Sequence, residues 1–173
     1  MADVFISYKK EDRDLAERVA NALAAYEVEV WWDKDLVGGH VFRSAISEEL
    51  RKAKVVIVIW SGRSVKSDWV LDEADYAKGY GKLLPIRFAL DFDVPLGFRQ
   101  VQVESLEGWA GAPDDPRFKR LVAQIEQLSE RKFSVIAQAL GPNLRAGAES
   151  TARMGGAFFK SLASADFLGL PLS

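Results

Sequence analysis

The sequence predicts a parallel, doubly wound α/β sheet with right-handed crossover connections. Short apolar runs alternate with helical patterns about five times over the first 130 or so residues, an order typical of such sheets. The run VVIVIW at 55–60 is unbroken and apolar, which indicates a central strand covered on both faces. The chain has 173 residues, enough for one domain and too few for two.

The strands are predicted by short runs of β-branched and aromatic residues that are bounded by turn residues. In chain order these runs are 4–8, 28–32, 55–60 and 83–88. A short fifth strand is expected near 101–103, inside a stretch rich in Pro, Gly and Asp. Because proline lacks a donor for the ladder, Pro85 predicts that the fourth run is an edge strand or begins a strand there.

The helices are predicted by apolar residues that recur at helical spacing between those runs. In chain order they fall at 9–27, 41–53, 68–78 and 115–133. Asp12 or Asp14 is the expected cap of the first helix, and Ser67 is the expected cap of the third. Gly79 and Gly81 are expected to end the third helix.

Composition excludes several kinds of site. Lys and Arg number 23 and Asp and Glu 25, so a formal net charge of −2 provides no field for nucleic acid. The absence of cysteine excludes disulfides, thiolate metal sites and a cysteine nucleophile. His40 is the single histidine, so a two-histidine metal site is impossible, and we expect no metal.

The apolar pattern predicts a cytoplasmic protein. The N-terminal segment has neither a basic region nor a long apolar stretch, so it is not expected to be a secretory signal. No run of about 18 apolar residues is present, so no membrane span is expected.

The last 40 residues differ from the rest of the chain. Only five of them are charged, and Ala, Gly and Ser dominate. We therefore predict a domain over 1–132 and a low-charge tail over 133–173 that contains one amphipathic segment. Two interpretations stay open: a loosely structured tail, or a helix that docks on a partner, a second copy of the chain or a membrane surface.

Several nucleotide and hydrolase motifs are missing. The sequence contains no G-x-x-x-x-G-K-[ST] loop, no G-x-G-x-x-G and no G-x-S-x-G elbow. A phosphoacceptor aspartate does not follow the third strand, where Trp60, Ser61 and Gly62 stand instead.

What remains is the segment SDWVLDEADYA, in which Trp69 and Glu73 share one helix face. This helix is predicted to begin at the carboxyl end of the central strand, where ligands bind in such sheets. A carboxylate beside a large aromatic ring at that end would suit a sugar, although such pairs are also common on half-buried helices.

Four segments, in order, carry a family resemblance. They are DVFISYKKED at 3–12, VWWDKDLVGGHVFRSAISEEL at 30–50, VVIVIWSGRSVKSDWVLDEADYA at 55–77 and LLPIRF at 83–88. Through them the sequence resembles the TIR (Toll/interleukin-1 receptor) domain family, most closely its stand-alone, NAD-cleaving bacterial members. The resemblance spans about 130 residues and implies a flavodoxin-like sheet of five parallel strands, flanked by helices on both faces.

The resemblance also implies one of two roles. The first is an NAD⁺ hydrolase or cyclase that cleaves the nicotinamide–ribose bond and releases ADP-ribose or a cyclic isomer. The second is a non-catalytic adaptor that associates with other TIR domains. In enzymatic members the essential carboxylate is the glutamate of W-x-x-x-E, which corresponds to Glu73, whereas signalling-only receptors generally lack it. The presence of Glu73 favours the enzyme, with NAD⁺ as substrate and no cofactor.

The implied chemistry needs a single carboxylate. Most glycosidases use a second carboxyl group to protonate the leaving oxygen, but nicotinamide leaves NAD⁺ as a neutral amine. Glu73 would hydrogen-bond the ribose hydroxyls and stabilise an oxocarbenium-like transition state. Water, or the adenine of the substrate, would then attack.

The resemblance names further candidate residues for substrate binding. Trp69 would stack on a ring of the substrate. Tyr8, Lys9 and Lys10 follow the first strand, where enzymatic relatives carry basic residues near the diphosphate; a solvated loop is the alternative for the lysines. Gly39 corresponds to the glycine of the family's BB loop and would let that loop change shape.

Assembly is a further expectation from the resemblance. Activity in the family commonly needs it, because the BB loop of one copy helps to complete the site of the next. We therefore expect self-association, or binding to other TIR domains, through the predicted loop 33–40. A role in bacterial defence and a role in virulence both stay open.

Overall fold

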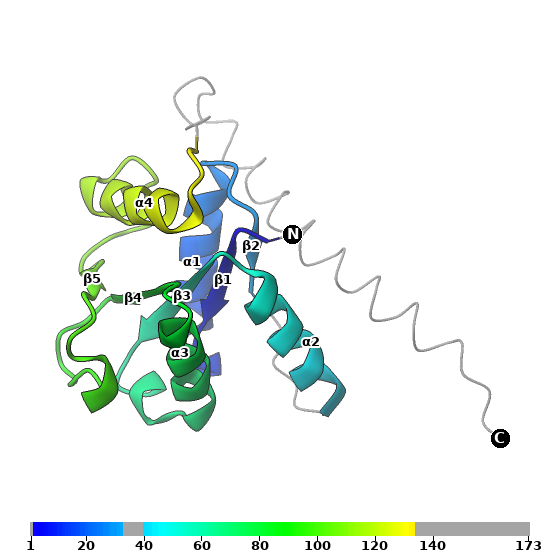
Figure 1. Cartoon of the computed structure of the whole chain (residues 1–173). Helices are drawn as coiled ribbons and strands as arrows, with labels where there is room; N and C mark the ends of the chain where they lie inside the picture. The colour runs from blue at the N-terminus through cyan, green and yellow to red at the C-terminus, as the bar shows by residue number, and fades with distance from the viewer. Residues whose placement is uncertain (1, 33–39, 134–173) are drawn as a thin grey trace.

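A five-stranded parallel sheet forms the centre of the computed structural model, which describes residues 2–32 and 40–133 (Figure 1). Its strands are β1 (Val4–Ser7), β2 (Val30–Trp31), β3 (Val55–Trp60), β4 (Leu83–Arg87) and β5 (Glu104–Ser105). Their spatial order is β2-β1-β3-β4-β5, and every neighbouring pair is parallel. The predicted fold class is therefore confirmed.

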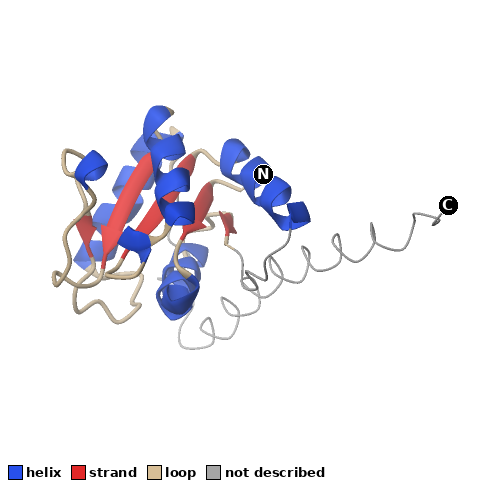
Figure 2. Cartoon of the chain, turned by 90° about the horizontal axis from the view of Figure 1, so that it is seen from below, coloured by secondary structure: helices blue, strands red, loops and turns tan. Residues whose placement is uncertain are grey.

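Helices cover both faces of this sheet (Figure 2). The α-helices are α1 (Arg13–Ala24), α2 (His40–Lys52), α3 (Asp68–Gly79) and α4 (Pro116–Ser129). Three short 3-10 helices join them: η1 (Lys10–Asp12), η2 (Ser64–Lys66) and η3 (Leu96–Phe98). Because α2 begins at His40, the predicted loop 33–40 is one residue too long at its end; residues 33–39 lie outside the described residues.

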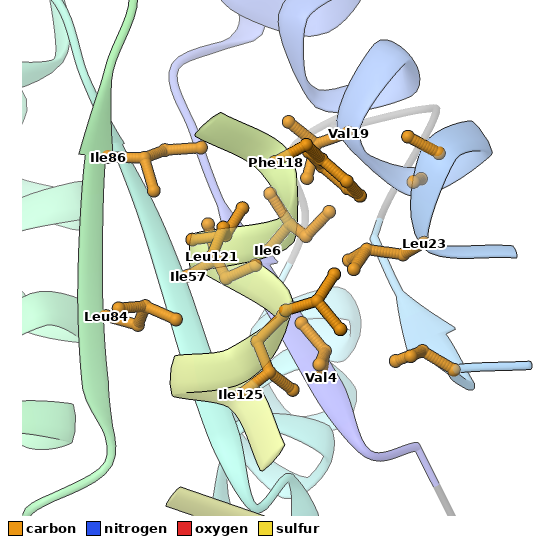
Figure 3. Close-up of a cluster of buried hydrophobic side chains, with 14 of the residues drawn as sticks. Val4, Ile6, Val19, Leu23, Ile57, Leu84, Ile86, Phe118, Leu121 and Ile125 are labelled. Atoms are coloured by element: carbon orange, nitrogen blue, oxygen red, sulfur yellow. The ribbon is translucent and has the colours of Figure 1, made fainter. Parts of the chain in front are cut away.

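Alternation along the strands divides the apolar side chains between two cores. Val4 and Ile6 of β1 face α1 and α4, where Phe118, Leu121 and Ile125 pack against the sheet (Figure 3). Phe5 of β1, with Val56 and Val58 of β3, faces α2 and α3 instead. All six residues of β3 are buried, as expected for a central parallel strand.

On the far side of the sheet, two positions differ from the expectation. The expected fifth strand is present, but it occupies Glu104–Ser105 and so begins three residues after the start of the predicted run 101–103. Pro85 lies in the middle of β4, which is flanked by β3 and β5 and so is not an edge strand. However, β5 pairs only with Ile86 and Arg87, so at Pro85 the strand has one neighbour. A missing ladder donor is tolerated there because the position resembles a sheet edge.

The helix caps also differ from the expectation. Asp12 and Ser67 occupy the N-cap positions of α1 and α3, but neither side chain makes a capping hydrogen bond. Asp115 does cap α4, where its carboxylate accepts from the Arg117 N–H at 2.8 Å. Gly79 is the last residue of α3, and Gly81 adopts the left-handed conformation in the turn beyond it.

Candidate active site

The strand order places a topological switch point between β1 and β3. The chain leaves β1 toward β2 on one side and leaves β3 toward β4 on the other. In open α/β sheets, ligands bind at the carboxyl end of the strands beside such a point. Ser7 ends β1 at this edge, and α3, which carries Trp69 and Glu73, follows β3. The helix with the candidate carboxylate therefore starts where the fold opens a crevice.

Glu73 is a buried carboxyl at this point, with 6% of its surface exposed. Burial raises its pKa to about 7, from an ordinary value of 4.5. Hydrogen bonding from Ser7 and Trp69 favours the carboxylate and limits the rise in pKa, while the neighbouring charge of Asp72 adds to it. A carboxyl with such a pKa carries its proton or loses it near neutral pH, which is typical of functional sites.

The Ser7 hydroxyl is close enough to Glu73 to lower the pKa of that carboxyl. However, within the described part of the chain no acceptor or donor lies at the distance and angle of a regular hydrogen bond to Ser7 Oγ. Buried hydroxyls are normally paired. The site therefore retains capacity for a hydrogen bond to a polar group of a ligand.

Two hollows meet at Glu73. The first is a narrow pocket against the carboxyl end of β1, lined by Phe5, Ile6, Ser7, Tyr8, Trp31, Ile46, Trp69 and Glu73. The second is a cleft of about 260 Å³ between α2 and α3, lined by Ser47, Leu50, Arg51, Trp69, Asp72, Glu73 and Tyr76. Trp69 and Glu73 line both hollows. A ligand that extended from one hollow into the other would therefore contact this aromatic ring and this carboxyl.

The structure brings together three of the residues singled out in the sequence. Tyr8 lines the narrow pocket beside Trp69 and Glu73, and its ring centre lies 6.3 Å from that of Trp32. Lys9 and Lys10 follow Tyr8 but are not among the residues that line either hollow. Gly39 lies outside the described residues.

Sequence reasoning missed the contributions of β1 and α2. Ser7 stands at the carboxyl end of β1, directly before the candidate residues Tyr8, Lys9 and Lys10. The helix α2 contributes Ile46, Ser47 and Arg51 to the two hollows. The periodicity of its sequence indicated an apolar face, but it did not indicate which neighbouring element that face would contact. The signal for α2 is its place in the order of elements, between β2 and β3, which puts it on the face covered by α3.

A partly buried polar network joins the loops on either side of the switch point. Ser61, after β3, donates its hydroxyl to the Asp12 carboxylate at 2.5 Å. The same Ser61 oxygen accepts from the Ser64 N–H at 3.0 Å, and Ser64 Oγ accepts from the Ser61 N–H at 2.7 Å. Asp12 is 5% exposed, so this hydrogen bond ties the start of α1 to the loop that leads into α3.

Two negative findings concern residues 2–32 and 40–133 only. Within them, no group of three or more His, Asp or Glu side chains is arranged to hold a metal ion. None of the helices described there is long and apolar enough to cross a membrane.

A family model of the TIR domain matches residues 4–122. The chain belongs to the TIR domain family. The match runs from β1 to the middle of α4 and includes Ser7, Trp69 and Glu73. The predicted domain boundary at 132 is not set by this match and stays a prediction.

Two curated proteins are similar to this chain in sequence. A probable 2′ cyclic ADP-D-ribose synthase, TcpO, of Methanobrevibacter olleyae is 30% identical over 139 residues, which cover 77% of this chain and 35% of that protein. The NAD(+) hydrolase PdTIR of Paracoccus denitrificans is 31% identical over 111 residues, 60% of this chain and 37% of that protein. The chain thus spans about a third of the length of these relatives.

Solved structures of TIR proteins share the fold. The TIR domain of the Toll-related receptor TRR-2 from Hydra magnipapillata superimposes with a TM-score of 0.60 at 20% identity, covering 73% of this chain and 99% of that domain. A TIR-STING receptor from C. gigas, solved with 2′,3′-cGAMP, gives a TM-score of 0.57 at 20% identity. The matched region covers 76% of this chain and 40% of that chain. These likenesses concern the fold alone.

Proposed function

We propose that this TIR domain is an NAD⁺ nucleosidase that cleaves the bond between nicotinamide and ribose. The observation that carries the proposal is Glu73: a nearly buried carboxyl with a pKa of about 7, beside Trp69, at the switch point of the sheet. The names of the two sequence relatives, a hydrolase of NAD⁺ and a synthase of cyclic ADP-ribose, support the same substrate.

The reaction needs a negative charge near the sugar and little else. Glu73 in its carboxylate form would accept hydrogen bonds from the ribose hydroxyls and stabilise the positive charge that develops on the ribose ring. The nicotinamide nitrogen takes the electron pair of the broken bond and leaves neutral, so no acid is required. Water adds to the sugar and releases a proton, giving ADP-ribose; attack by a group of the substrate itself gives a cyclic isomer.

The surrounding side chains would bind and orient the substrate. Trp69 would stack on one of its rings and exclude water from the reacting bond. The Ser7 hydroxyl, which lacks a full partner, would pair with a sugar hydroxyl beside Glu73. Tyr8 would close the narrow pocket, and Lys9 and Lys10 would approach the diphosphate from its rim. Gly39 and the segment 33–39 would act in self-association, which we expect to raise activity.

The experiment measures NAD⁺ loss and product identity by chromatography over a range of protein concentrations. Wild type is expected to consume NAD⁺ more than proportionally as concentration rises. Glu73→Gln is expected to lose activity by at least about a hundredfold, because the amide carries no charge to stabilise the transition state. Asp75→Asn is the matched control, because Asp75 is an exposed carboxylate on the same helix.

Two results would contradict the proposal: activity in Glu73→Gln close to that of wild type, or no NAD⁺ consumption by wild type even when concentrated. In the second case a non-catalytic TIR–TIR module becomes the leading function. Its signature would be binding to another TIR domain that survives Glu73→Ala.

A further inference from the structure

One wall of the cleft beside Glu73 is formed by α2. This helix contributes Ser47, Leu50 and Arg51 to the cleft and Ile46 to the narrow pocket. Among its described side chains, Ile46 and Leu50 are buried, and Ala53 is buried directly after the helix. The dimensions of the cleft therefore depend on how the C-terminal half of α2 is held against α3.

The C-terminal end of α2 leaves carbonyl groups without helical partners. The Ala53 N–H still donates to the Glu49 carbonyl at 3.0 Å. The next two N–H groups, of Lys54 and Val55, donate instead to the carbonyl of Asp3 at the start of β1. The carbonyls of Leu50 and Arg51 consequently need donors from elsewhere in the molecule, as the last carbonyls of a helix do.

Lys82, which directly precedes β4, supplies those donors. Its ammonium lies 2.7 Å from the Leu50 carbonyl oxygen, 3.1 Å from that of Arg51 and 3.0 Å from that of Ala53. An ammonium has three N–H groups, and three acceptors surround this one. A cation at the C-terminus of a helix also interacts favourably with the helix dipole.

Lys82 is itself held by two other elements. Its backbone N–H donates to the Ala77 carbonyl in α3 at 3.0 Å, and its carbonyl accepts from the Val56 N–H of β3 at 2.8 Å. Its ammonium lies 5.2 Å from the centre of the Tyr76 ring and 6.0 Å from that of Tyr80. Tyr76 lines the cleft. A single residue thus links α2, through its side chain, to α3 and to the central strand, which its backbone contacts.

We propose that Lys82 is a positioning residue, which fixes α2 at the distance from α3 that ligand binding in the cleft requires. This role rests on the proposed function only in that the cleft is taken as the substrate site. Lys82 lies outside both hollows and acts through the Leu50 and Arg51 carbonyls on the wall that they belong to. Loss of the ammonium is therefore expected to loosen α2 and weaken substrate binding, while Glu73 keeps its place on α3.

The first test compares Lys82→Met with Lys54→Met in the full chain. Both remove one lysine charge near the end of α2, but Lys54 is exposed, and only Lys82 has its ammonium on the helix carbonyls. Hydrogen exchange followed by mass spectrometry is expected to show amides 44–53 exchanging at least about tenfold faster in Lys82→Met, with α1 and α4 unchanged. The KM for NAD⁺ is expected to rise at least about fivefold, and kcat to change less than about twofold.

A second variant restores the cation chemically. Because the chain has no cysteine, Lys82→Cys creates a single thiol, which is alkylated in denaturant before refolding. Aminoethylation rebuilds an ammonium of nearly lysine length, whereas reaction with iodoacetamide adds a neutral group. The aminoethyl form is expected to recover slow exchange in α2 and the wild-type KM, and the neutral form to recover neither.

The outcomes separate this proposal from the function that it deepens. If wild type consumes no NAD⁺, the proposed function fails, and exchange in α2 alone still decides whether Lys82 holds the helix. Unchanged exchange in Lys82→Met, equally faster exchange in all helices, or equal rescue by both alkylations would each overturn the conclusion that Lys82 holds α2. Faster exchange in α2 with an unchanged KM would overturn its positioning role.

Discussion

At the scale of single residues, Glu73 combines burial with a need for charge. Burial raises its pKa to about 7, so near neutral pH the folded protein holds a mixture of the acid and the carboxylate. The proposed chemistry needs the carboxylate, and the core favours the acid. Stability and activity should therefore respond to pH in opposite directions, with activity rising through about pH 7.

The first prediction follows from that pKa. Between about pH 4.5 and 7, Glu73 binds a proton in the folded protein but not in the unfolded chain. The free energy of unfolding therefore falls as pH rises through this window, by about 3 kcal/mol for a shift of this size. Glu73→Gln should lack this fall, which urea unfolding of both proteins at about pH 5 and about pH 8 would measure.

Ser7→Ala provides an internal check on this prediction. The Ser7 hydroxyl lowers the Glu73 pKa, so its removal should extend the fall in stability to higher pH. Parallel pH dependence in wild type and Glu73→Gln would mean that the carboxyl titrates at an ordinary pKa.

At the scale of elements, the site depends on how two loops are joined. Asp12 comes from the loop after β1, and Ser61 from the loop after β3. Their hydrogen bond spans the switch point, and it holds the approach to α3 against the start of α1. Ser67, at the N-cap position of α3, does not hold the start of that helix in the same way, because its side chain makes no capping hydrogen bond.

Ser61→Ala should therefore destabilise the protein by about 1–3 kcal/mol, because it leaves the buried Asp12 carboxylate without its hydroxyl donor. Ser67→Ala should change the free energy of unfolding by less than about 0.5 kcal/mol. Urea unfolding of both variants tests the contrast, with Ser61→Thr as the variant that keeps the hydroxyl. Equal small effects of both alanine substitutions would show that the network does not hold the loops.

At the scale of the whole molecule, both cores close within the described residues. The cluster between α1, α4 and the sheet and the cluster between α2, α3 and the sheet draw their buried members from residues 4–125. After α4 the chain is held by Arg131, which lies 2.8 Å from the buried Asp3 carboxylate, and by Phe133, which packs on the first core. A folded unit that ends near 133 is expected from these contacts.

A chain that ends after Phe133 should accordingly unfold in one transition, with the urea midpoint and the m-value of the full chain. Circular dichroism during urea titration measures both quantities. A lower midpoint or m-value would mean that residues beyond 133 bury surface against the domain, and it would move the domain boundary predicted at 132.

Local pattern was enough for the outline of this domain. The apolar run 55–60 marks a strand buried on both faces, and the helical spacing of 115–133 marks α4, because both signals depend on neighbours in the chain. The W-x-x-x-E spacing placed Trp69 and Glu73 on one helix face, since a helix brings residues four apart together. The caps were less predictable, because Asp12 bonds Ser61, 49 residues away, rather than its own helix.

Contacts between distant segments decided the rest. Ser7 meets Glu73 because β1 and β3 pair in one register, and Lys82 meets the end of α2 because β4 starts beside it. Pro85 is tolerated because the ladder to β5 begins one residue later. Burial then raises the pKa of Glu73 to about 7, although a glutamate at the same spacing from a tryptophan on an exposed helix would keep an ordinary pKa. Periodicity within one segment carries no information on such pairings, because they depend on which faces the folded chain brings together.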